Sequence, residues 1–114
     1  MERLLNGHAE LAAELELVAE IVDDALYEYY PLGKYVVRAP GVCGGRPTFK
    51  YTRIDVDFVL SQLVYDQAIA EIVADYAHPH LTEDAIKEAL KLAVSAFQSY
   101  YQAPLVGAEL QQTR

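Results

Sequence analysis

The sequence of 114 residues is poor in several residue types. It has one cysteine, no tryptophan, and nine cationic residues against seventeen acidic ones. The single cysteine, Cys43, excludes an internal disulfide, which fits a reducing compartment. No apolar run approaches the roughly 20 residues that cross a bilayer, and the amino terminus has acids where a secretion signal needs apolar residues. We therefore expect a cytoplasmic protein with no membrane segment.

Recognisable catalytic motifs are also missing. There is no phosphate-binding loop signature, no paired catalytic acids and no triad. His78 and His80 flank a proline with no evident third ligand, and Cys43 has no adjacent base to activate it. We expect no enzymatic activity, no metal and no cofactor.

Apolar spacing over residues 9–30 predicts an amphipathic helix. Side chains recur every three or four residues on one stripe, with acids mostly off it. The stripe holds Leu11, Leu15, Val18, Val22, Ala25 and Tyr29, and it is widened by Leu17, Ile21 and Leu26. So wide a face predicts contact with another helix or another subunit, and we expect a homodimer.

The rest of the chain predicts a small β element and then three helices. Short β-prone runs surround a glycine-rich loop, and helical spacing follows, with Asp57 and Thr82 as N-caps. The strands are expected at 35–38, 48–51 and 53–56, and the helices at about 57–65, 68–76 and 83–101. This pattern predicts a mainly α protein with an N-terminal helical extension at 1–33, one domain at 34–101 and a flexible tail at 102–114.

Positive charge is concentrated in residues 34–53, the basic segment. Residues 1–33 hold eight acids and one base, and residues 54–114 hold nine acids and three bases. The basic segment has five bases and no acid: Lys34, Arg38, Arg46, Lys50 and Arg53. Such a segment in a chain of net charge −8 predicts a local anion site or a self-complementary surface. These five residues are the candidate partner-binding or anion-binding residues.

Two readings of this segment remain open. Its glycines free backbone N–H groups, which with the nearby cations are able to receive a phosphate or carboxylate. Alternatively, the glycines only shape a turn. For Arg53 we favour a structural role, as an ion pair with Asp55 or Asp57 at the corner between strand and helix.

A motif pattern runs through GGRPTFKYTRIDVDFVL, IAEIVADY and LTEDAIKEALKLA. Over about residues 41–93 it resembles the bacterial family catalogued as domain of unknown function 433. Members of that family resemble small trihelical, helix-turn-helix domains preceded by short strands, and some are similar to VapB-type antitoxins. The resemblance implies a helix-turn-helix-like trihelical core after the small β element and the N-terminal helix. The chain departs from the pattern at Tyr51, where the family usually has glycine, and in the longer link at 76–82.

The resemblance implies a non-catalytic interaction protein, an antitoxin or small regulator. Its partner would be a toxin-like protein, with operator DNA as a further candidate. Glu83 and Asp84 open the third helix with two acids, so DNA contact is expected from the basic segment of a dimer rather than from this helix. The alternative is an accessory domain that binds a small anion or nucleotide at the Gly41–Arg53 loop.

Overall fold

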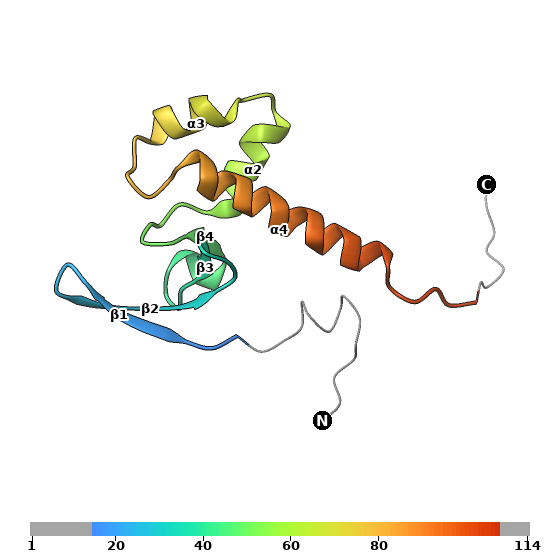
Figure 1. The fold of residues 1–114 in the computed structure, drawn as a ribbon, viewed down its shortest axis with the longest axis horizontal. Coiled ribbons are helices and arrows are strands. Elements are labelled where there is room, and N and C mark those ends of the chain that lie inside the picture. Colours follow the sequence, from blue (N-terminus) through green and yellow to red (C-terminus); the bar gives the residue numbers. More distant parts are fainter. Residues whose placement is uncertain (1–14, 108–114) are drawn as a thin grey trace.

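The computed structural model describes residues 15–107, which form a four-stranded antiparallel sheet and three helices (Figure 1). The strands lie side by side in chain order, each antiparallel to the next. They are β1 (Val18–Val22), β2 (Ala25–Pro31), β3 (Val36–Arg38) and β4 (Pro47–Phe49), with a single 3-10 turn at Cys43–Gly45 before β4. The helices are α2 (Val56–Val64), α3 (Ile69–Tyr76) and α4 (Glu83–Tyr101).

Strands β1 and β2 form a hairpin, so the predicted amphipathic helix is wrong over residues 15–30. The pairing runs from Val18 opposite Tyr29 to Val22 opposite Ala25. Asp23 and Asp24 make the turn with φ of 52° and 66°. Two-residue hairpins favour this left-handed geometry, and aspartate tolerates it. The part of the predicted helix at 9–14 lies outside the described residues.

The helical spacing arose because both faces of the hairpin carry apolar side chains. On β1, Val18 and Val22 lie on one face and Ile21 on the other, and together they repeat at intervals of three and four. Valine, isoleucine and tyrosine are strand formers, and this composition favoured the hairpin. With this sheet on the N-terminal side of three helices, the prediction of a mainly α fold with an N-terminal helix is wrong.

One of the two predicted N-caps is confirmed and the other is wrong. The Thr82 hydroxyl accepts the Ala85 N–H at 3.1 Å and caps α4, as predicted. At α2 the cap is Asp55 rather than Asp57, because the helix begins at Val56 and the Asp55 carboxylate accepts the Asp57 N–H at 2.9 Å. The predicted third strand at 53–56 is reduced to one bridge between Thr48 and Asp55.

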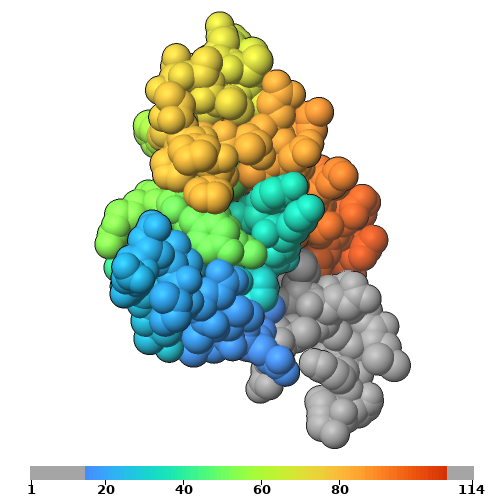
Figure 2. All heavy atoms as spheres, turned by 60° about the vertical axis from the view of Figure 1, so that its left-hand side comes forward, coloured from blue at the N-terminus to red at the C-terminus, as the bar shows by residue number. Residues whose placement is uncertain are grey.

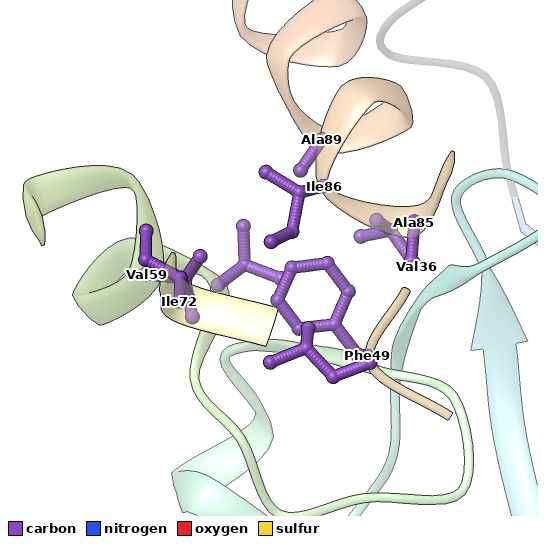
Figure 3. Packing of buried hydrophobic residues seen from close by; sticks show 9 residues of the cluster. Val36, Phe49, Val59, Ile72, Ala85, Ile86 and Ala89 are labelled. Atoms are coloured by element: carbon purple, nitrogen blue, oxygen red, sulfur yellow. The ribbon is translucent and has the colours of Figure 1, made fainter. Parts of the chain in front are cut away.

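The main core lies between the β3–β4 pair and the helices. Figure 3 shows the Phe49 ring in the middle of this cluster, with Ile86 of α4 above it and Val36 of β3 to one side. Phe49, Ile72, Leu81 and Ile86 are fully buried. A second, smaller cluster joins Tyr29 of the hairpin to Val37 and Ala39 on the other side of β3.

One carboxylate ties α4 to the sheet. Glu88 accepts the backbone N–H groups of Lys34, Tyr35 and Val36, at 2.7, 2.6 and 3.0 Å. Gly33 leaves room for it, because a Cβ at Gly33 would lie 2.6 Å from the Glu88 carboxyl carbon. A contact this short would force the carboxylate to shift away from the three N–H groups that hold it.

We expect Glu88→Ala to lower the free energy of unfolding by about 2–4 kcal/mol, because three N–H groups lose a charged acceptor. Gly33→Ala should also destabilise, but less so in the Glu88→Ala background, where the clashing carboxylate is gone. Urea denaturation measures both effects. Lys87→Ala, an exposed neighbour on α4, is the control and should change stability by less than about 0.5 kcal/mol. Strictly additive losses for the two substitutions would contradict this coupling.

Candidate partner-binding and anion-binding surface

The structure divides the five cations of the basic segment among three places. Figure 2 shows this segment between the hairpin and the helices. Lys34 and Lys50 line one pocket, and Arg53 lines a separate groove beside the hairpin. Arg38 and Arg46 approach the turn at Gly44 and Gly45. The segment is therefore not a single anion site.

Arg38 and Arg46 hold the glycine-rich loop in place. The Arg38 Nε donates to the Gly45 carbonyl oxygen at 2.7 Å. The Arg46 guanidinium pairs with the Asp55 carboxylate, with nitrogen–oxygen distances of 2.9 and 2.8 Å, and this contact raises the pKa of Arg46. Asp55 thus pairs with Arg46 rather than with Arg53, the partner expected from the sequence. Arg53 forms no ion pair with a side chain of residues 15–107.

The loop itself is a closed turn. The N–H groups of Val42, Gly45 and Arg46 donate to carbonyl oxygens of the loop, at 3.0, 2.9 and 3.2 Å. Gly44 and Gly45 have φ of 66° and 82°, in the left-handed region that glycine enters without strain. The Cys43 thiol lies 3.2 Å from the Arg53 carbonyl oxygen and closes the loop against the next segment. This geometry favours the turn-shaping role of the glycines over an open phosphate cradle.

Lys34 and Lys50 share a pocket of about 210 Å³. The Lys50 N–H donates to the Tyr35 carbonyl oxygen at 2.7 Å, which brings the two ends of the basic segment together. The Lys34 ammonium lies 5.2 Å from the Tyr35 ring, and the Lys50 ammonium lies 5.4 Å from the Tyr51 ring. His80 completes the lining, which contains no acidic residue. Two ammonium groups and an imidazole on aromatic walls suit a small anion or a phosphate group.

Tyr51 connects this pocket to the hairpin. Its hydroxyl donates to Glu20 at 2.8 Å, and its backbone N–H donates to the Tyr27 hydroxyl at 3.1 Å. Tyr51 has φ of 69°, which is unfavourable for a tyrosine, and the family usually has glycine there. The hairpin contacts hold the tyrosine in this conformation.

Glu20 is the charged centre of this cluster, and motif analysis missed it. Its carboxylate also accepts the Tyr29 hydroxyl, which raises the pKa of Tyr29 to about 12. The hydrogen bonds from Tyr29 and Tyr51 lower the pKa of Glu20. The sequence signal was the departure from glycine at Tyr51, but nothing in the sequence paired that residue with Glu20, 31 positions away.

The two histidines of the link before α4 take part in ring contacts. His80 lies 5.0 Å from the Tyr51 ring and 5.8 Å from the His78 ring, as centroid distances. Among residues 15–107 no group of three or more His, Cys, Asp or Glu side chains is placed to hold a metal ion. None of the helices in this range is long and apolar enough to span a bilayer.

The profile of a family described as "Protein of unknown function (DUF433)" matches residues 36–93, about half of the chain. The chain belongs to this family. No curated protein and no solved structure matches the chain. The match covers the strands β3 and β4, the helices α2 and α3, and α4 as far as Ala93. The β1–β2 hairpin and the end of α4 lie outside the match and extend the DUF433 unit at its two ends.

The lowered pKa of Glu20 predicts a loss of stability in acid. Because the folded pKa lies below the ordinary value of 4.5, this stabilisation is complete above pH 4.5 and disappears as the pH falls through the folded pKa. We expect the melting temperature of the wild type to fall more steeply below pH 4.5 than that of Glu20→Gln, in thermal melts by circular dichroism. Glu16→Gln, at an exposed position just before β1, should keep the wild-type slope. Identical slopes for the wild type and Glu20→Gln would contradict this assignment.

Proposed function

We propose that this protein is a non-catalytic, homodimeric interaction protein of the antitoxin or small-regulator kind. Its protein partner binds the C-terminal half of α4, residues 90–101. Two things support the proposal: residues 36–93 belong to a family of which some members are similar to VapB-type antitoxins, and the helical surface has the character of a binding site. The proposal depends mainly on the exposed surface of α4.

The C-terminal half of α4 is largely apolar and exposed, and Lys91 near its start is its one charged side chain. Val94, Phe97 and Tyr101 expose 55%, 63% and 57% of their surface, and residues 92–101 include no charged side chain. Figure 1 shows this half of α4 extending past the sheet and the other helices. Exposed apolar surface of this kind in a small protein is typical of a binding site.

The spacing of the apolar side chains suits a helical partner. Leu90, Val94, Phe97 and Tyr101 follow one another at intervals of four, three and four residues. This is the spacing of a coiled-coil seam, in which each side chain inserts between residues of a facing helix. The Phe97 and Tyr101 rings already meet edge to face at 5.3 Å, which gives the seam a preformed aromatic anchor.

Co-purification with a protein encoded by a neighbouring reading frame tests this proposal. Co-purification of the two proteins should be lost when Phe97→Glu places a charge in the seam, with affinity reduced by at least about 100-fold. Gln98→Glu, one residue away on α4, introduces the same charge off the seam and should bind as the wild type does. Equal binding by both variants, with melting temperatures unchanged, would refute the α4 surface as the partner site.

The Lys34–Lys50 pocket favours anion binding as a second candidate function. Its lining has two lysines and a histidine and no acid, although Glu20 is near enough for the charge of Lys50 to help lower the Glu20 pKa; Arg46, in contrast, is paired directly with Asp55. DNA phosphates and a small phosphorylated ligand are both anions that such a pocket suits. We therefore assign anion binding to this pocket, whereas the sequence analysis assigned it to the Gly41–Arg53 loop.

A salt titration separates this second candidate from non-specific attraction. If DNA binds here, Lys34→Gln with Lys50→Gln should flatten the dependence of affinity on salt, because phosphate contacts release counterions. Lys87→Gln with Lys91→Gln removes the same charge from α4 and should leave the slope nearly unchanged. The probe is the DNA upstream of the protein's own reading frame. An equal change of slope in the two double variants would contradict a role for the pocket.

A further inference from the structure

We propose that the groove beside the β1–β2 hairpin binds a small apolar carboxylate. The groove has a volume of about 580 Å³ and lies between the tip of the hairpin and residues 51–54, the segment that joins β4 to α2. Sites for small molecules usually measure about 300–1,000 Å³ and have mainly apolar walls with a few polar groups. The groove shares only Tyr51 with the Lys34–Lys50 pocket, and the α4 surface does not line it, so this site goes beyond the proposed function.

The inner face of the hairpin forms one wall of the groove. Side chains alternate along a strand, and directly opposed residues of an antiparallel pair point to the same side. Val22 lies opposite Ala25, so both share the inner face with Tyr27 and Tyr29. Tyr29 is buried against β3, but at the tip this cover ends, since Val22 is only half-buried and Ala25 is exposed. Figure 2 shows the hairpin, in blue, against the green segment that follows β4.

The DUF433 unit forms the other wall. Val42 of the glycine-rich loop and Ile54 after β4 line it with apolar side chains, and both are half-buried. The Tyr51 ring lies 5.5 Å from the Tyr27 ring of the hairpin, as a centroid distance, so an aromatic ring from each wall meets the other. The hairpin lies outside residues 36–93, which match the family. The groove is therefore a feature that this chain adds to the family unit.

The polar side chains of the groove offer hydrogen-bond donors. The His78 Nδ1 accepts the His80 N–H at 3.0 Å, so the hydrogen of the neutral ring is on Nε2. The Tyr27 hydroxyl accepts the Tyr51 N–H at 3.1 Å, which leaves its own hydrogen to donate. Arg53 forms no ion pair with a side chain of residues 15–107, and no acid lines the groove. The groove therefore lacks an acceptor for these donors.

A carboxylate on an apolar body matches these walls. A carboxylate accepts hydrogen bonds and donates none, and the planar guanidinium of Arg53 suits it with two parallel bonds. Asp55, the nearest acid after Arg53 in the chain, is already paired with Arg46. The Asp23–Asp24 turn lies next to the groove in the chain, and its repulsion of an anion grows with the charge of that anion. A single negative charge is therefore favoured over a phosphate dianion.

Titration with naphthylacetate tests this site in the full-length chain. Nitrogen–proton correlation NMR spectra should show binding with a Kd of about 0.1–1 mM, because the ligand is small and makes one ion pair. The largest shifts should fall on the amides of Val22, Ala25 and Ile54. Naphthylacetamide has the same rings without the charge and should bind at least about tenfold more weakly. Acetate has the charge without the rings and should cause no shift at these amides.

Two substitutions change the groove, and each has a matched control. Arg53→Gln removes the cation and should raise the Kd for naphthylacetate about tenfold or more. Ala25→Glu adds an acid to the exposed tip and should do the same by repulsion. Lys91→Gln removes a charge and Ala70→Glu adds one at exposed positions outside the groove, so both should bind as the wild type does. Circular dichroism melts on each variant establish that it is folded.

Three outcomes overturn the proposal. Absence of shifts with about 5 mM naphthylacetate, above the expected Kd, shows that the groove does not take such a ligand. Equal affinity for naphthylacetamide, or wild-type affinity in Arg53→Gln, shows that no carboxylate is recognised by the arginine. Shifts centred on Lys34 and His80 place the ligand in the other pocket. The α4 surface keeps its own test in each case, because it contributes nothing to the groove.

Discussion

The carboxylate of Glu88 accepts three consecutive backbone N–H groups from the turn before β3, and the placement of α4 depends on this contact. It joins residues more than fifty positions apart in the sequence, and it fits only because position 33 has no side chain. The N-terminal half of α4, which includes Ala85, Ile86 and Ala89, is thereby held over the core. The helix then continues in the same direction, so its apolar C-terminal residues are carried beyond the sheet.

A second set of contacts joins the hairpin to the DUF433 unit. Tyr51 occupies a left-handed conformation, which costs on the order of 1 kcal/mol for a side chain of this kind. Its bonds to Glu20 and Tyr27 offset that cost and fix the inner face of the hairpin. The opposite face of the hairpin, which carries Ile21 and Leu26, is exposed. The two extensions of the family unit therefore each present an apolar surface, one at each end of the molecule.

The sequence predicted secondary structure reliably where a segment is stabilised by interactions between residues close together in the chain. Thr82 begins α4 and the apolar spacing of 83–101 follows it, because capping and helical hydrogen bonds both act within a few residues. The same local reasoning failed at 15–30, where apolar residues on both faces of a strand copied the spacing of a helix. Strand formation there depends on pairing across the Asp23–Asp24 turn and on packing against Val37 and Ala39, which periodicity alone does not report.

By itself, the sequence determined the separation of charge along the chain, the family relationship of residues 36–93 and the three helices that follow the sheet. These follow from composition, motif spacing and local capping. Only the tertiary structure decided how the five cations are used: Arg46 is paired with Asp55, Arg38 is bonded to the loop, Lys34 and Lys50 share a pocket, and Arg53 lines the groove beside the hairpin. Ion pairs and pockets join residues by distance in space, and the folded backbone alone sets that distance.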